Sequence, residues 1–99
     1  MADDLQPTLP NSLAARDIAY HFHPQTNLAA HLTVGPHTIA RGDGAYVWDT
    51  DGNRFLEGMS GLWCTALGFS EPRLIEAAER QMRTLPYYQS FGHRSVEPA

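Results

Sequence analysis

The spacing of apolar residues predicts a short helix near the N-terminus. Between residues 11 and 22 apolar side chains recur at helical intervals, on Leu13, Ala14, Ala15, Ile18 and Ala19. Asn11 or Ser12 can cap the first turn by accepting a hydrogen bond from a backbone N–H. The helix is expected to end before His23, because the following Pro24 disfavours helical backbone at the residue that precedes it.

After residue 38 the pattern takes the two-residue period of extended strands. Along residues 45–49 the odd positions face one side of a strand, and Tyr46 and Trp48 face the other. Gly52 suits a tight hairpin turn, because it accepts positive φ without a Cβ clash. We expect a small antiparallel meander with strands near 37–41, 45–49 and 54–57 and with the Arg-Gly-Asp sequence of residues 41–43 as a turn.

The strongest helical pattern begins after residue 70. Ser70 or Glu71 can cap it, and Pro72 is tolerated in the first turn because its missing N–H has no intrahelical partner. Pro86 stops the helix. Its apolar stripe consists of Leu74, Ile75, Ala77, Ala78 and Met82. Two i,i+4 charge pairs are expected opposite the stripe, Glu76 with Arg80 and Glu79 with Arg83.

These elements together predict an α+β fragment. It contains an N-terminal helix, a small three-stranded antiparallel meander and one amphipathic helix. Residues 1–10, which include two prolines and little apolar material, are expected to form a flexible tail.

Composition narrows the classes of function. The formal net charge is −4 and no basic stripe is present, which argues against binding to nucleic acid or to an anionic membrane surface. No apolar run has the length needed to span a bilayer, and the first ten residues lack the features of a secretory signal. The single Cys64 cannot form an internal disulfide. We therefore expect a cytoplasmic chain.

The stretch Gly58–Phe69, GMSGLWCTALGF, places glycines beside Trp63 in a connection between elements. One interpretation is a bend whose Trp63 caps a small core. The other is a ligand-binding wall, because glycine lets backbone approach a ligand while the indole encloses it. Three aromatic residues follow the second helix, and they are either buried or part of an exposed patch for a partner: Tyr87, Tyr88 and Phe91.

His21 and His23 are candidate metal ligands. They share a face only if the backbone is extended, and no third ligand follows at the spacing typical of zinc sites. We therefore expect no metal site. Cys64 is expected to be an inert small hydrophobe, because no base is identifiable near it.

Several segments, in this order, resemble the N-terminal part of class III pyridoxal-phosphate (PLP) aminotransferases of fold type I. They are FHPQTN, RGDGAYVWDTDGNRFLEGMSGLWC, EAAERQM and LPYYQSFGH, and the likeness is greatest to the ω-transaminases. The resemblance implies that residues 11–86 pack with the small domain of a homodimeric enzyme. Residues 87–99 would then begin the link to a large PLP domain that is missing from these 99 residues.

The resemblance also implies a substrate pocket. Leu62 and Trp63 match positions that line the pocket, where the indole would limit the size of the amine. Phe91 matches an aromatic residue that reaches into the neighbouring subunit's site, and Tyr88 lies near the same interface. Gln25 stands where many ω-transaminases have an aromatic residue, so a preference for bulky arylalkyl amines is not implied.

The implied activity is transfer of an amino group from an amine or ω-amino acid to a keto acid. In this family a lysine holds PLP as a Schiff base and moves the proton. All seven basic residues here are arginines, so no side chain of these 99 residues can form that Schiff base. The chain alone is expected to be inactive, without an assignable catalytic or cofactor-binding residue. A non-catalytic interaction module or a decayed transaminase remnant remains the alternative.

Overall fold

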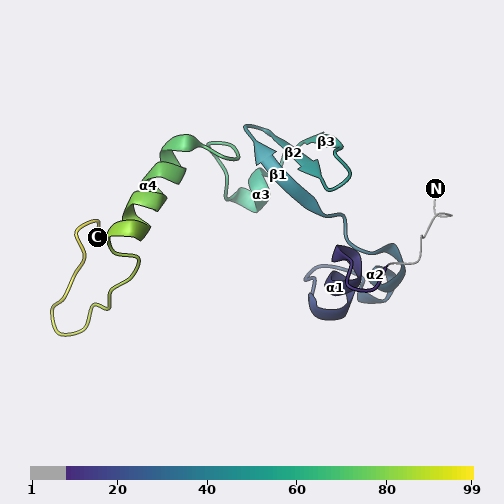
Figure 1. Cartoon of the computed structure of the whole chain (residues 1–99), viewed down its shortest axis with the longest axis horizontal. Helices are drawn as coiled ribbons and strands as arrows, with labels where there is room; N and C mark the ends of the chain where they lie inside the picture. Colours follow the sequence, from purple (N-terminus) through teal and green to yellow (C-terminus); the bar gives the residue numbers. More distant parts are fainter. Residues whose placement is uncertain (1–8) are drawn as a thin grey trace. The chain divides into compact units, whose positions relative to one another are not determined.

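The computed structural model of the chain describes residues 9–99, which divide into two units at Thr38 and Ile39 (Figure 1). The first unit contains α1 (Leu13–Tyr20) and α2 (Leu28–Val34). The second contains β1 (Ile39–Asp43), β2 (Tyr46–Asp49), β3 (Arg54–Leu56), α3 (Ser60–Trp63) and α4 (Pro72–Thr84). Most of the tail expected over residues 1–10 lies outside the described residues, so its flexibility stays a prediction.

The N-terminal helix α1 is confirmed, and its cap explains where it begins. The Ser12 hydroxyl accepts a hydrogen bond of 3.1 Å from the Ala15 backbone N–H, which satisfies one of the free donors of the first turn. Beyond Tyr20 the backbone is no longer helical, as Pro24 requires of His23.

Helix α2 was not among the predicted elements. The Asn27 side chain accepts a hydrogen bond of 3.1 Å from the Ala30 N–H, and the helix ends at Gly35, whose φ is 71°. Both residues are recognisable signals of helix ends. The helix has only seven residues, too few for its apolar positions to show a clear period.

The predicted meander is confirmed as an antiparallel sheet of order β1-β2-β3. The prediction of a turn at residues 41–43 was wrong. Arg41, Gly42 and Asp43 belong to β1 and pair with Trp48, Val47 and Tyr46. The chain instead turns at Gly44, which adopts a φ of 56°. Glycine at that position carries no steric cost, so the strand continues to the residue that precedes it.

The β2–β3 turn is built around a buried carboxylate. Asp49 is 6% exposed and accepts hydrogen bonds from the backbone N–H groups of Asp51 and Asn53, at 3.0 and 2.8 Å. Its other oxygen accepts a third, of 3.0 Å, from the Asn53 side chain. Gly52 adopts the expected positive φ, 86°. Asp49 therefore acts as a turn-forming residue, in agreement with the hairpin signal in the sequence.

The two faces of the sheet differ in what covers them. On one face the Arg41 guanidinium lies 3.5 Å from the centroid of the Trp48 ring, and Arg54 lies 4.7 Å from that of Tyr46. On the other face Val47, 6% exposed, is the only buried apolar side chain among residues 9–99. A core of this size contributes about 2 kcal/mol of burial energy, so the described residues have little core of their own.

Helix α4 begins as predicted, with Glu71 as the N-cap and Pro72 in the first turn. One of its two predicted charge pairs forms, Glu79 with Arg83 at 2.9 Å. No ion pair joins Glu76 and Arg80 in the described chain.

The apolar stripe of α4 is largely exposed. Three of its side chains are more than half exposed, those of Leu74, Ile75 and Met82. Among residues 9–99 no helix is both long enough and apolar enough to cross a membrane.

Candidate functional site

The Gly58–Phe69 stretch, called the Trp63 turn below, contains a left-handed helical turn. From Ser60 to Trp63 four successive residues have positive φ, of 52°, 59°, 67° and 70°. The Trp63 N–H donates to the Met59 carbonyl at 2.9 Å and the Cys64 N–H to the Ser60 carbonyl at 2.8 Å. This conformation costs about 1–2 kcal/mol for each residue that carries a Cβ. Such a cost persists only where surrounding contacts impose it, and it is typical of functional sites.

The side chain of Glu57 supports the beginning of the left-handed turn. One carboxylate oxygen accepts a hydrogen bond of 3.0 Å from the Met59 N–H, and the other accepts one of 2.9 Å from the Gly61 N–H. The Glu57 N–H itself donates to the Ala45 carbonyl at 2.9 Å. The two charge-assisted hydrogen bonds therefore offset part of the backbone cost and connect the turn to the sheet.

The end of the Trp63 turn is joined to the β1–β2 connection. Gly44 and Phe69 exchange two backbone hydrogen bonds, of 3.0 and 2.8 Å. Gly68 has a φ of 88°, and a Cβ at this position would lie 2.9 Å from the Gly44 carbonyl oxygen. The Ser70 hydroxyl donates to the Gly42 carbonyl at 2.7 Å. Both ends of the turn are thus tied to the same sheet.

This geometry exposes the two side chains that the sequence analysis placed in a pocket. Trp63 is 90% exposed and Leu62 is 64% exposed. The interpretation in which Trp63 caps a small core is therefore wrong for the described chain. Other residues of the turn, Ser60 and residues 65–69, line a shallow hollow of about 350 Å³ together with Glu57 and the β1–β2 connection, but Leu62 and Trp63 do not line it.

Within the second unit, no hydrogen bond or ring contact of the described residues joins Tyr88 or Phe91 to the Trp63 turn. Tyr88 and Phe91 lie after α4 in a segment without helix or strand, 50% and 80% exposed. Gln25 belongs to the first unit, where it is exposed with a φ of 55°. The structure thus joins only Leu62 and Trp63, and the roles of all five residues stay predictions.

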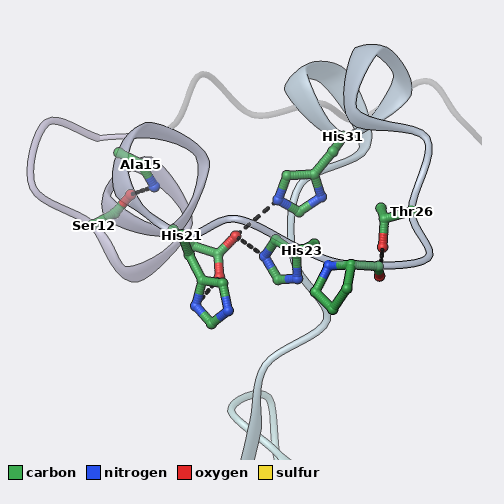
Figure 2. A network of polar contacts seen from close by, with 8 residues as sticks. Ser12, Ala15, His21, His23, Thr26 and His31 are labelled. Atoms are coloured by element: carbon green, nitrogen blue, oxygen red, sulfur yellow. Dashed lines mark hydrogen bonds and ion pairs between the residues drawn. The ribbon is translucent and has the colours of Figure 1, made fainter.

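A second polar site, which we call the Asp17 cluster, lies in the first unit and consists of Asp17, His21, His23 and His31. The Nε2 atoms of His23 and His31 lie 2.7 and 2.8 Å from the same Asp17 oxygen, Oδ1. All three imidazole rings contact the Asp17 carboxylate, and Figure 2 shows His21, His23 and His31 close together with these contacts as dashed lines. The His23 ring centroid is 4.3 Å from that of His21 and 4.4 Å from that of His31.

These contacts lower the pKa of Asp17. The main cause is the hydrogen bond from His23, with further contributions from the hydrogen bond of His31 and from the charges of His23 and His21, while partial desolvation acts in the opposite direction. Sequence reasoning missed Asp17 and His31 as members of this cluster. The i,i+4 spacing of Asp17 and His21 was a usable signal, whereas His31 is brought in only by the fold.

Comparison with known proteins decides the family. The profile of the family described as Aminotransferase class-III matches residues 28–99. This chain belongs to that family. Gamma-aminobutyrate transaminase 1, mitochondrial, of Oryza sativa subsp. japonica is 52% identical over 66 residues, which are 67% of this chain and 13% of that protein. Gamma aminobutyrate transaminase 3, chloroplastic, of Solanum lycopersicum is 37% identical over 102 residues, 95% of this chain and 19% of that protein.

Solved structures support the same assignment. The crystal structure of the ω-transaminase from Pseudomonas jessenii in complex with PMP matches with a TM-score of 0.84 and 52% identity, over 88% of this chain and 19% of that one. The described helices and the three-stranded antiparallel sheet of this class III aminotransferase chain match the N-terminal part of a transaminase fold. The chain spans less than a fifth of the length of these relatives.

Proposed function

We propose that this chain contributes the N-terminal part of a PLP-dependent aminotransferase that transfers an amino group from an amine or ω-amino acid to a keto acid. The observation that carries the proposal is the left-handed turn, which presents Trp63 to solvent at 90% exposure within a class III sequence. A costly backbone conformation holds this indole outside any core. Such an indole is suited to border a pocket whose other walls come from parts of the protein beyond these 99 residues.

The engineered relatives support this role for Trp63. A tryptophan-to-glycine variant of a thermostable ω-transaminase, 52% identical to this chain, was engineered for the synthesis of bulky amines. A further variant replaces that tryptophan together with a phenylalanine 28 positions later. Trp63 and Phe91 have the same spacing of 28 positions. We infer that Trp63 limits the size of the amine and that Phe91 borders the equivalent pocket of the neighbouring subunit.

The coenzyme does not fit these 99 residues by themselves. They contain no lysine, so they offer no side-chain amine to hold PLP covalently. When bound to the whole enzyme, PLP would supply the electron sink for amino transfer. The residues described here would shape and enclose the amine side of the pocket, and we assign them no role in proton transfer.

A chimera tests the proposal. The matching segment of the Pseudomonas jessenii ω-transaminase is replaced by this chain, and kcat/KM is measured for a small and a bulky amine. In the chimera, Trp63→Gly is expected to raise the ratio of bulky to small amine kcat/KM about tenfold, since steric exclusion in an apolar pocket is worth 1–3 kcal/mol. Tyr20→Ala, at a residue 88% exposed in the first unit, is the control and should leave the ratio unchanged. An active chimera whose ratio does not respond to Trp63→Gly would contradict the role of Trp63.

We further propose that the whole protein is a homodimer in which Phe91 and Tyr88 lie near the neighbouring subunit's site. Their exposure, 80% and 50%, leaves them available for such a contact. A polar Gln25 would widen or wet the pocket, so Gln25→Tyr should change the ratio of bulky to small amine kcat/KM in the chimera. A chimera that is active as a monomer by light scattering would refute the dimer.

A cytoplasmic location is likewise a proposal. The names of the rice and tomato relatives place those proteins in mitochondria and chloroplasts. Cell fractionation of the native protein distinguishes the possibilities, and recovery from an organelle would contradict the proposal.

A further inference from the structure

The Asp17 cluster contains more ligand-type atoms than a hydrogen-bonded pair requires. One ligand atom each from Asp17, His21 and His23 lies within 4.8 Å of the others. His31 adds a fourth side chain through its contact of 2.8 Å with Asp17 Oδ1. Neutral imidazole nitrogen and carboxylate oxygen together are a donor set that suits borderline divalent ions such as Zn²⁺ and Ni²⁺.

The distances in the cluster are close to those of a coordinated ion. Zinc binds imidazole nitrogen and carboxylate oxygen at about 2.0–2.2 Å, which separates two ligand atoms of a tetrahedral site by roughly 3.3 Å. The Asp17 oxygens lie 2.7 Å from His23 Nε2 and 3.9 Å from His21 Nδ1, one below and one above this value. The three ligand atoms lie within 4.8 Å of one another, so shifts of up to about 1.5 Å would bring all three to a common ion.

We propose that Asp17, His21 and His23 bind a divalent transition-metal ion of the Zn²⁺ class, with His31 as a fourth ligand or as the residue that orients Asp17. This proposal does not depend on the proposed function. Zn²⁺ would take the place of the Nε2 proton that His23 donates to Asp17; a neutral ring would carry its proton on Nδ1 instead, and an imidazolium would release one proton to solvent. The carboxylate, which already faces three imidazoles, would supply the negative charge.

His21 distinguishes this site from a simple hydrogen-bonded clamp. Its Nδ1 lies 3.9 Å from Asp17 Oδ2, beyond hydrogen-bond distance, yet its ring stacks on His23. Its side chain is 63% exposed, while those of His23 and Asp17 are 26% and 19% exposed. An ion can therefore reach the cluster from solvent on the His21 side without opening the fold.

The fold supplies the third ligand that the sequence spacing did not offer. The expectation of no metal site rested on the absence of a third ligand after His23. The third ligand comes instead from α1, where Asp17 lies one helical turn before His21, and His31 comes from α2. A bound ion would join α1, the following loop and α2, three segments that share little buried apolar surface.

Titration of the tag-free chain with ZnCl₂ alone, by isothermal calorimetry near pH 7, tests the proposal. We expect one Zn²⁺ per chain. Asp17→Asn and His23→Gln, which preserve size and hydrogen bonding, should each weaken binding roughly tenfold or more, and His31→Gln about tenfold. His93→Asn is the matched control, because His93 lies in the second unit and its φ of 63° is one that asparagine tolerates.

Two further results separate the folded site from a local His-X-His motif. A His-X-His motif that binds Zn²⁺ in the unfolded chain would retain its affinity in Asp17→Asn, and this result would overturn the proposal. The absence of Zn²⁺ binding by the parent chain would also overturn it. In the parent chain the imidazole NMR signals of His21 and His23 should shift on addition of Zn²⁺ while those of His93 do not. Circular dichroism verifies that each variant keeps its helices, and an equal loss of affinity in His93→Asn would also refute the site.

Discussion

The Trp63 turn and the Asp17 cluster each depend on one carboxylate, but the two carboxylates accept from different kinds of donor. Glu57 accepts from the backbone N–H groups of Met59 and Gly61. Asp17 accepts from the imidazoles of His23 and His31. Backbone N–H groups do not titrate and do not bind metal ions, whereas imidazoles do both.

This difference distinguishes a carboxylate that binds fixed backbone donors from one that binds side-chain donors. The Glu57 contacts are made to fixed backbone donors, which suits a turn that must present Leu62 and Trp63 in one orientation. The Asp17 contacts change with pH, because protonation of the carboxylate removes an acceptor, and we propose that they also change with metal ions. The arrangement around Asp17 suits a region whose stability responds to pH.

The largest effect is expected when the far end of the Trp63 turn is disrupted by Gly68→Ala. Its new Cβ would lie 2.9 Å from the Gly44 carbonyl oxygen, at a φ of 88°. Backbone strain and the clash together should cost about 3 kcal/mol. The matched control is Gly52→Ala, since Gly52 has a φ of 86° and open space around its Cβ position. Amide exchange at Phe69 is the measurement, and equal effects of the two substitutions would show that the clash contributes nothing.

Much of the sheet was predictable because its signals are local. Alternation along residues 45–49 fixed the strand faces, and Val47 is buried while Tyr46 is exposed, as that alternation requires. Gly52 fixed the hairpin turn. The error at residues 41–43 arose because the Arg-Gly-Asp sequence and the true turn at Gly44 contain the same turn-forming residue types.

The candidate site was predictable in residue identity but not in conformation. Leu62 and Trp63 have φ of 67° and 70°, values that no propensity assigns to leucine or tryptophan. Their backbone is imposed by Glu57 and by the Gly44–Phe69 pair, and both contacts depend on the tertiary fold. His31 in the Asp17 cluster lies 14 residues from Asp17, a separation that sequence periodicity does not register.

An intermediate effect is expected at Glu57. Glu57→Gln replaces two charged acceptors by one neutral acceptor, so at least one of the Met59 and Gly61 N–H groups loses its partner. The local free energy of opening should fall by about 1–2 kcal/mol, equivalent to roughly tenfold faster amide exchange at Gly61. Glu76→Gln on exposed α4 serves as the control. Unchanged exchange at Gly61 would mean that the left-handed turn is held by its far end alone.

The smallest effect on stability is expected at Asp17, and this effect depends on pH. Its pKa is lowered in the folded chain, so the ionised carboxylate stabilises the fold at pH values above the unfolded pKa of about 3.9. That contribution is lost as the pH falls through the lower folded value. The difference in stability between the parent chain and Asp17→Asn, followed by helix content in urea without metal, should shrink as the pH falls through the lowered pKa of Asp17 and vanish in stronger acid.

The control for this pH dependence is Asp51→Asn, in the exposed β2–β3 turn, which removes a carboxylate that lies outside the cluster. Its difference from the parent should not follow the Asp17 profile. If the Asp17→Asn difference instead persists unchanged in strong acid, the hydrogen bonds from His23 and His31 do not depend on the ionised carboxylate. The Trp63 turn and the Asp17 cluster would then differ in the chemistry of their hydrogen-bond donors but not in their response to pH. The proposed difference between Glu57 and Asp17 would be refuted.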